Sequence, residues 1–258
     1  MRQIKRIGFI FVILVIIFLG FYSYLVANYF PPILMYHQID QVLAEKNTIA
    51  VSSDIFARQM DFIKRHNYNV IPLEGLCEML KKKNKLPHNL VVITFDDGYK
   101  NNLTAIKVLK EYNFPATIFL VVNWIDKENY LSREDLDWIV KNSKVCFGSH
   151  TLNHPYLPGV SIEELRQEIS GSKQKAKEEY SVDLLTLAYP VGGFTQDALQ
   201  EAKEAGYLCA CSTNRGFSRK LDIYALRRIK ITNRDLGIRL WGKLSGFYNL
   251  FRRPKPPY

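Results

Sequence analysis

The chain has 258 residues, of which 47% are hydrophobic and 23% are charged, and this composition is typical of a folded globular protein. It excludes a largely disordered chain, and the length fits one α/β domain with short appendages. The formal net charge is +10, yet no zinc-finger, basic-zipper or aromatic RNA-binding motif is present, so we expect no nucleic acid partner. Attraction to an anionic lipid or glycan, and a basic surface without specific function, both stay open.

The N-terminal segment predicts a membrane anchor. Residues 7–26 are apolar apart from Gly, Tyr and Ser, and about twenty such residues cross a bilayer as a helix. Basic residues stand only on its N-terminal side, which the positive-inside rule places in the cytoplasm. We therefore expect a cytoplasmic stub and a single transmembrane signal-anchor in residues 1–30, and an extracytoplasmic domain in residues 31–258. Cleavage near Ala27 is the alternative.

After Pro31 and Pro32, short apolar runs alternate with amphipathic stretches. Strands are predicted at 33–36, 69–71, 91–95, 116–122, 145–149, 185–189, 208–211 and 229–231. Helices are predicted at 53–66, 74–83, 101–112, 133–142, 161–180, 196–205 and 234–246. This alternation predicts an α/β fold with a parallel sheet, and seven or eight units favour a distorted (β/α) barrel. Reactive residues should then lie at the carboxyl ends of strands.

Two polar clusters follow predicted strands. Asp96 and Asp97 come directly after an apolar run, and two adjacent carboxylates repel each other unless a metal or cation neutralises one. A helix N-cap is the simpler explanation for such a pair. His150 and His154 follow another strand, and histidines four residues apart can bind one metal ion. Two histidines and one aspartate leave coordination positions open, which predicts a catalytic metal with the second aspartate as base.

A third histidine ends the first predicted strand. In a closed barrel this strand neighbours the last one, so His37 shares the same mouth and can protonate a leaving group. A hydrogen-bonded structural histidine is the alternative. His66 and His88 lie in polar stretches and are expected to take no part.

These motifs resemble the polysaccharide deacetylase family, also called the NodB-homology domain or carbohydrate esterase family 4. Thr-Phe-Asp-Asp-Gly stands at 94–98, and His-Thr-x-x-His-Pro stands at 150–155. The resemblance implies that Asp96 is the catalytic base and that Asp97, His150 and His154 bind a divalent metal. Zinc is expected, with Co²⁺, Ni²⁺ or Fe²⁺ as alternatives.

The family's third motif, Arg-x-Pro-Tyr-Gly, is altered here to Ala-Tyr-Pro-Val-Gly-Gly at 188–193. The alignment implies that the Val191 N–H is the oxyanion donor and that Tyr189 and Pro190 line the substrate site. Arg228 is a candidate to replace the missing arginine, although Arg227 is equally available by sequence.

The family's fifth motif has no counterpart, because no histidine follows His154. One branch, similar to the poly-N-acetylglucosamine deacetylases, carries an Ala-Tyr-Pro motif and an N-terminal Met-Tyr-His. That similarity favours His37 as general acid and a β-1,6-linked glucosamine polymer as substrate. Three alternatives stay open: a peptidoglycan or O-acetyl deacetylase, an inactive glycan-binding module, and a structural envelope component.

The four cysteines and the C-terminal tail carry weaker signals. Without a Cys-x-x-Cys pair, the cysteines are expected mostly in the core, with disulfides possible in an exported domain. The tail after residue 234 combines an apolar helical face with basic residues. We favour a final helix packed on the barrel over one that lies on an anionic membrane surface.

Overall fold

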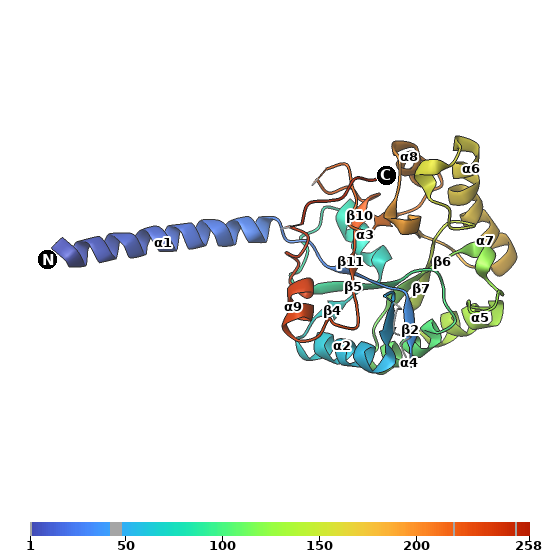
Figure 1. Cartoon of the computed structure of the whole chain (residues 1–258), viewed down its shortest axis with the longest axis horizontal. Helices are drawn as coiled ribbons and strands as arrows, with labels where there is room; N and C mark the ends of the chain where they lie inside the picture. The colour runs from blue at the N-terminus through green and yellow to red at the C-terminus, as the bar shows by residue number, and fades with distance from the viewer. Residues whose placement is uncertain (1, 42–47, 219, 251) are drawn as a thin grey trace.

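The computed structural model describes residues 2–41, 48–218, 220–250 and 252–258. Helix α1 (Arg2–Ala27) projects from an α/β body, and most of its described apolar side chains are exposed (Figure 1). Its segment Phe9–Ala27 has a mean hydropathy of 2.7, so it is long and apolar enough to cross a membrane. A signal sequence has the same properties, and α1 is therefore a candidate span.

The body is a nearly closed parallel barrel. Eight strands pair in the order β10-β9-β8-β7-β6-β5-β1-β11, and β4 (Asn69–Val70) also pairs with β5. Their bounds are β1 (Ile33–Tyr36), β5 (Leu90–Phe95), β6 (Ala116–Leu120), β7 (Val145–Ser149), β8 (Thr186–Ala188), β9 (Cys209–Ser212), β10 (Leu226–Arg227) and β11 (Ile229–Lys230). The two end strands are consecutive in the chain and are separated only by Arg228. One extended segment therefore pairs first with β9 and then with β1, and this brings the two edges of the sheet together.

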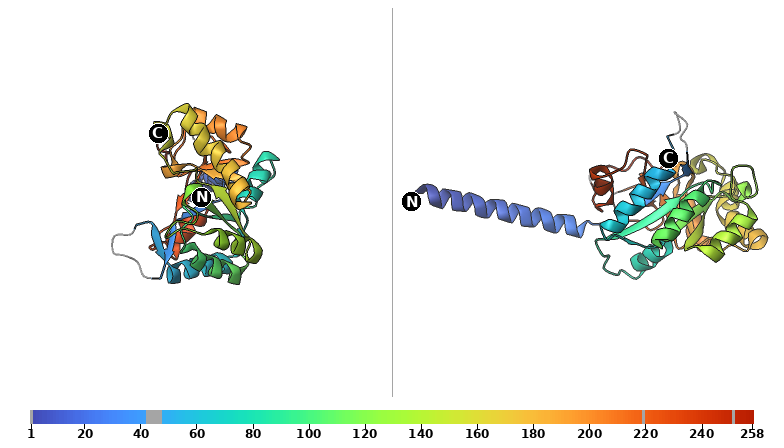
Figure 2. Two further views of the ribbon diagram at one scale, coloured as in Figure 1. Left: turned by 90° about the vertical axis from the view of Figure 1, so that its right-hand side faces the viewer. Right: turned by 90° about the horizontal axis from the view of Figure 1, so that it is seen from below.

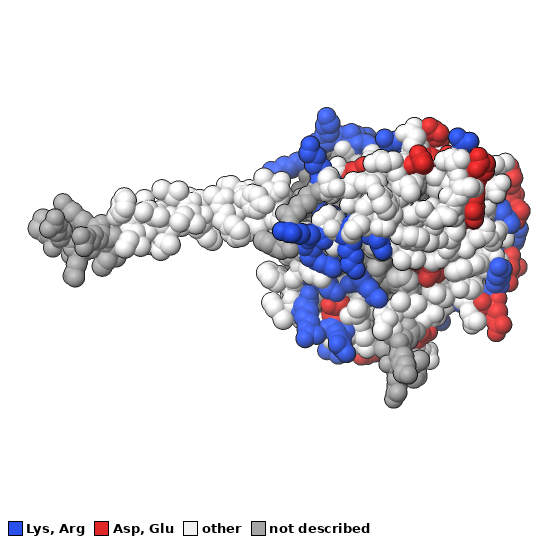
Figure 3. Space-filling model, turned by 45° about the horizontal axis from the view of Figure 1, so that its top comes forward, with Lys and Arg blue, Asp and Glu red and all other residues white. Residues whose placement is uncertain are grey.

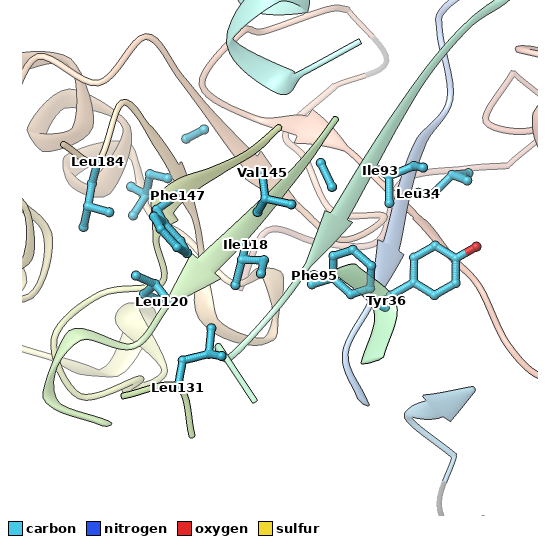
Figure 4. Packing of buried hydrophobic residues seen from close by; sticks show 14 of the residues in the cluster. Leu34, Tyr36, Ile93, Phe95, Ile118, Leu120, Leu131, Val145, Phe147 and Leu184 are labelled. Carbon is cyan, nitrogen blue, oxygen red and sulfur yellow. The ribbon is translucent and has the colours of Figure 1, made fainter. Parts of the chain in front are cut away.

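Helices surround this sheet (Figure 2). They are α2 (Ser53–Arg65), α4 (Asn102–Tyr112), α5 (Arg133–Asn142), α6 (Ile162–Arg166), α7 (Ser172–Tyr180), α8 (Gln196–Glu204) and α9 (Ile238–Leu244). A large apolar cluster fills the space between helices and strands, and Figure 4 shows its members on β1, β5, β6 and β7. All six residues of β5 are buried, as expected for a parallel strand that is covered on both faces.

A second apolar cluster fills the barrel interior. Helix α3 (Leu73–Lys81) contributes Leu73, Leu76 and Cys77 to it, beside inward residues of the strands such as Val92 and Phe119. A disulfide between Cys77 and Cys209 joins α3 to β9. The barrel interior is therefore a packed core, as in other (β/α) barrels.

The structure departs from the sequence prediction at several elements, and the two-residue strand β10 is one that was not predicted. A two-stranded parallel sheet, β2 (Gln38–Asp40) with β3 (Ala50–Ser52), was not predicted, because three-residue runs carry too little periodicity. The helix predicted over 161–180 contains a π-helical turn, η3 (Gln167–Gly171). Helix α9 begins at Ile238 and ends at Leu244, so it is shorter at both ends than the predicted 234–246, and it packs on the barrel through buried Leu240 and Leu244.

Candidate active site

The carboxyl ends of separate strands bring the predicted polar residues together. Asp96 and Asp97 follow β5, and His150 follows β7. His37 follows β1, and Arg228 lies between β10 and β11. Because all these strands are parallel, their carboxyl ends lie on one side of the barrel, as the sequence analysis expected.

Three of these side chains form a compact group that could hold a metal ion. One ligand atom each from Asp97, His150 and His154 lie within 4.8 Å of one another. The Oδ1 atom of Asp97 is 3.5 Å from the Nε2 atoms of both His150 and His154. Two imidazole nitrogens and one carboxylate oxygen fit zinc and its neighbours, and a set of three leaves coordination positions for water and substrate.

The surroundings of the two histidines favour neutral imidazoles, which is the form that binds metal. Burial lowers the pKa of His150 to about 3, and burial also lowers the pKa of His154. The Nδ1 atom of His150 lies 2.7 Å from the carbonyl oxygen of Ala188, so Nδ1 is the protonated nitrogen and Nε2 stays available. Burial and the neighbouring Asp96 carboxylate raise the pKa of Asp97 to about 6, which a cation at this position would counteract.

Asp96 is held by a buried arginine. The guanidinium of Arg228 donates two parallel hydrogen bonds to Asp96, Nη1 to Oδ1 at 2.5 Å and Nη2 to Oδ2 at 2.8 Å. Both side chains are buried. Burial alone would raise the pKa of Asp96, but Arg228, with His150 and His37, outweighs it and keeps that pKa well below its usual range. Asp96 is therefore ionised and fixed in orientation.

The Arg228 side chain is oriented by the last turns of the barrel. Its Nε atom donates to the carbonyl oxygen of Ser212 at 3.1 Å, and Nη1 is 3.3 Å from the hydroxyl of Thr94. Of the two arginines that the sequence offered, Arg228 points inward to Asp96, while Arg227 precedes it on β10 and is partly exposed. Alternation of side chains along an extended segment explains why only one of two neighbours enters the barrel.

His37 lies at the edge of the same group. Its Nε2 atom is 3.9 Å from Oδ2 of Asp96, and the side chain is 19% exposed. Asn102 donates a hydrogen bond to the carbonyl oxygen of His37 at 2.7 Å and holds this turn in place. The imidazole therefore faces both Asp96 and solvent, which is the position required of a group that exchanges protons with a substrate.

The third-motif segment is strained at Val191. This residue has φ +55° and ψ +5°, a left-handed conformation that β-branched residues rarely adopt, and its side chain is 59% exposed. Tyr189 and Pro190 are buried, and the Tyr189 hydroxyl donates to the carbonyl oxygen of Tyr224 at 3.0 Å. Tyr189 and Pro190 therefore support the turn from the protein interior, and the Val191 side chain is exposed at its surface.

Sequence reasoning missed Glu168, which organises the metal-binding loop. The buried carboxylate accepts hydrogen bonds from the backbone N–H groups of Leu152 and Asn153, both at 2.9 Å, and from the Asn153 side chain at 2.7 Å. Glu168 lies on the π-helical turn η3, and such turns often occur at functional sites. Its only signal in the sequence was a glutamate in an otherwise ordinary amphipathic helix.

Aromatic rings border the metal-binding group. Trp124 stacks on His154 with ring centroids 5.5 Å apart, and it also contacts Tyr130. Tyr130 stacks in turn on Tyr99, whose side chain hydrogen-bonds Asp97. These partly exposed rings give one wall of the mouth an apolar face suited to the planar side of a sugar. His66 and His88 lie elsewhere, stacked on Phe62 and Tyr29 respectively.

Comparison with known proteins agrees with this geometry. The polysaccharide deacetylase family model matches residues 83–210. The Bacillus subtilis protein YxkH, which is named for the polysaccharide deacetylases, is 30% identical over 203 residues, covering 78% of this chain and 71% of YxkH. The poly-β-1,6-N-acetyl-D-glucosamine N-deacetylase of Staphylococcus epidermidis is 28% identical over 207 residues, covering 73% of this chain and 70% of that protein.

A solved structure supports the same assignment. The Streptococcus pyogenes deacetylase PplD, in complex with acetate, superposes with a TM-score of 0.75 at 26% identity, over 83% of this chain and 99% of PplD. Fold, sequence and the group of polar residues at the strand ends therefore agree, and the chain belongs to the polysaccharide deacetylase family of enzymes.

Proposed function

We propose that this enzyme is a metal-dependent N-deacetylase that acts outside the cytoplasm on a polymer of N-acetylglucosamine. The observation that carries the proposal is one juxtaposition: the Asp97, His150 and His154 group lies beside an Asp96 carboxylate that Arg228 keeps ionised. The similarity to the staphylococcal enzyme supports a β-1,6-linked polymer. Removal of acetyl from nitrogen rather than oxygen follows from the same similarity.

The metal-binding residues fit a divalent ion, with zinc favoured by the donor set. When bound, such an ion supplies Lewis-acid chemistry and lowers the pKa of a coordinated water. Asp97, His150 and His154 would hold it. Neutral imidazoles and a single carboxylate would leave one net positive charge on the group, which suits a reaction in which negative charge develops on the acetyl oxygen.

The remaining roles follow from position. Asp96 is placed to accept the proton of the attacking water, and Arg228 fixes both of its oxygens. His37, on the other side of Asp96 and open to solvent, is placed to protonate the departing sugar nitrogen. The Val191 N–H would donate to the developing oxyanion, and one such donor contributes about 3 kcal/mol to transition-state stabilisation. Acetate and a free amine result.

The extracytoplasmic location is supported by two features. The candidate span Phe9–Ala27 would anchor the chain, with residues 1–30 as the anchor segment and residues 31–258 as the catalytic domain. The disulfide between Cys77 and Cys209 is the kind of bond that persists in an oxidising compartment outside the cytoplasm.

The proposal is tested with the purified full-length chain. Bound metal is measured by mass spectrometry, and acetate release is measured from β-1,6-linked and β-1,4-linked N-acetylglucosamine oligomers and from peptidoglycan fragments. We expect release that needs metal, that prefers the β-1,6 series, and that is lost in Asp96→Asn and His150→Ala. His66→Ala, a histidine outside the site, should retain full release.

The other outcomes are informative in different ways. Metal binding without acetate release from any glycan would overturn the proposed catalysis in favour of a glycan-binding module. Preference for peptidoglycan or for O-acetylated sugars would keep the hydrolase and overturn the proposed polymer. Release that survives removal of all metal would overturn the proposed metal dependence.

A further inference from the structure

A pocket of about 520 Å³ lies where α1 meets the barrel. One wall comes from the last turn of α1 and the residues that follow it, including Tyr24, Ala27 and Tyr29. A second wall comes from the segment between β9 and the end of β10, including Arg215, Lys220 and Arg227, and the C-terminal segment adds Gly246, Asn249 and Leu250. The proposed catalytic machinery does not use this pocket, because the metal-binding group lies at the carboxyl ends of the strands and β1 begins at the α1 side.

The position of the pocket relative to α1 is fixed by contacts. The Tyr29 ring stacks on His88 at 4.5 Å between centroids and meets the edge of Phe247 at 5.9 Å. The Phe30 N–H donates to the carbonyl oxygen of Gly246 at 3.3 Å. Since the apolar segment of α1 ends at Ala27, these contacts place the pocket at the level where a span would leave the hydrocarbon core.

The pocket is basic and is flanked by exposed apolar side chains. Three cationic residues and one carboxylate, that of Asp222, line it, and Asp222 accepts a hydrogen bond from the Tyr224 N–H at 2.8 Å. Two large apolar side chains of the same loop, Phe217 and Leu221, are 45% and 56% exposed. Figure 3 shows lysine and arginine side chains gathered around the base of α1, whereas acidic side chains concentrate farther from it.

We propose that this pocket binds the phosphate headgroup of an anionic phospholipid in the leaflet from which the catalytic domain emerges. The inference rests on the membrane anchoring proposed above. Cationic side chains beside exposed apolar ones are the composition of segments that lie in the interface of a membrane containing anionic lipid. The charge complements a phosphodiester, and the exposed side chain of Leu221 would insert next to it, whereas the Phe217 ring packs on Phe194 and Tyr258.

A lipid held here would add a second attachment beside the single helix. Because the strands run from the α1 end to the catalytic end, this attachment would keep the mouth of the barrel directed away from the membrane. A polymer that extends from the cell surface would then have access to the site. The bound lipid therefore orients the domain and takes no part in the chemistry.

The test uses the full-length chain in a neutral detergent. Soluble dihexanoyl phosphatidylglycerol, dihexanoyl phosphatidylcholine and glycerol 3-phosphate are titrated by calorimetry. We expect phosphatidylglycerol to bind at least tenfold more tightly than the other two, and Lys220→Glu to weaken it about tenfold. Lys107→Glu on α4, an equal charge change at an exposed lysine of another face, should leave the affinity unchanged.

Several outcomes would overturn the proposal. Equal affinity for phosphatidylcholine would exclude headgroup selection, and equal affinity for glycerol 3-phosphate would identify a site for free phosphate esters. An equal loss in Lys107→Glu would show a general effect of net charge. Acetate release by the same purified proteins, and carbonate extraction of membranes from the cells that express them, report the deacetylase function and the anchoring separately, so their failure is distinguishable from failure of lipid binding.

Discussion

Arg228 and Asp96 form a buried bidentate ion pair although 132 positions separate them in the chain. Arg228 stands at the point where one extended segment passes from pairing with β9 to pairing with β1. Closure of the barrel and orientation of the proposed base therefore depend on the same residue. The backbone of Asp96 is also held by β1, because its N–H donates to the carbonyl oxygen of Tyr36 at 3.0 Å.

Replacement of the arginine should change the pH dependence of the reaction. In Arg228→Met the Asp96 carboxylate loses the interaction that lowers its pKa, so the pKa rises. A base works only when ionised, and the acid limb of the kcat/KM profile should therefore move to higher pH. Removing one partner of a buried pair also costs about 3–5 kcal/mol of stability, measurable by urea unfolding.

Two further variants make this prediction specific. Arg228→Lys keeps a positive charge but loses the planar fork, so its acid limb should lie between those of the wild type and Arg228→Met. Arg227→Met changes the neighbouring side chain, which does not enter the barrel, and it should leave the acid limb of the kcat/KM profile at the wild-type pH. An unshifted profile in a folded Arg228→Met protein would show that Arg228 does not set the ionisation of the base.

Two variants of Val191 should separate the effect of its backbone strain on stability from the effect of its N–H on kcat. Val191→Gly keeps the backbone N–H and relieves a left-handed conformation that costs about 1–3 kcal/mol, offset by about 0.5–1 kcal/mol of added chain entropy. We expect a stability gain of about 1 kcal/mol with acetate release within about threefold of wild type. Val191→Pro removes the N–H, and its ring also excludes the positive φ of this turn, so it should lower kcat by about 100-fold or more and also destabilise the turn.

Val191→Ala serves as the control, because it shortens the exposed side chain and retains the N–H. It should keep near-normal kcat. If Val191→Pro folds, as judged by circular dichroism, and still releases acetate at the wild-type rate, Val191 is not the oxyanion donor.

Glu168 should influence metal affinity without touching the metal. In Glu168→Gln the amide oxygen can accept from the two backbone N–H groups only if the amide nitrogen faces the Asn153 side-chain NH₂ group, so the loop that carries His154 would lose part of its support. Loss of such an outer hydrogen-bond partner typically weakens metal binding about 10–100-fold. Competition with a chromophoric chelator measures this affinity. Glu163→Gln, an exposed glutamate on α6, should bind metal normally, and equal affinity in both variants would refute the role of Glu168.

Much of the fold could be predicted because each βα unit carries its own local signal. The apolar runs 33–36 and 145–149 coincide with β1 and β7, and the amphipathic stretch 133–142 coincides with α5. The candidate site residues could be chosen for the same reason, since each polar cluster directly follows an apolar run. Because the strands are parallel, residues that directly follow them, such as Asp96, Asp97 and His150, lie at the same end of the sheet.

The parts that could not be predicted depend on contacts between distant segments. Arg227 and Arg228 are equivalent by sequence, and only the closure of the barrel decides which one reaches Asp96. Glu168 acquires its role because a π-helical turn rotates it toward the loop at 152–153. The pairing of Cys77 with Cys209 likewise depends on α3 lying across the end of the barrel. None of these leaves a periodic or compositional trace.

Glu74 on α3 should make stability depend on pH in an unusual direction. Both carboxylate oxygens are buried, and no other described residue donates a hydrogen bond to them. Burial raises the pKa of Glu74, and its own backbone N–H offsets this only in part. The folded state therefore holds the proton more tightly than the unfolded state does. Stability should fall as pH rises from the ordinary glutamate pKa through the raised one, because folding then keeps a charge away from water.

Glu74→Gln removes this titration and should stabilise the protein at pH 7.5 by about 1–3 kcal/mol, with no gain at a pH well below the ordinary glutamate pKa, where both states are protonated. Thermal unfolding at the two pH values measures the difference, and about 1 kcal/mol corresponds to a Tm shift of roughly 2–4 °C in a chain of this size. Glu78→Gln is the matched control, because Glu78 lies on the same helix in an exposed pair with Lys82 and should change stability by no more than about 0.5 kcal/mol. A gain of equal size at both pH values would mean that the amide improves packing, and it would exclude a buried charge as the cause.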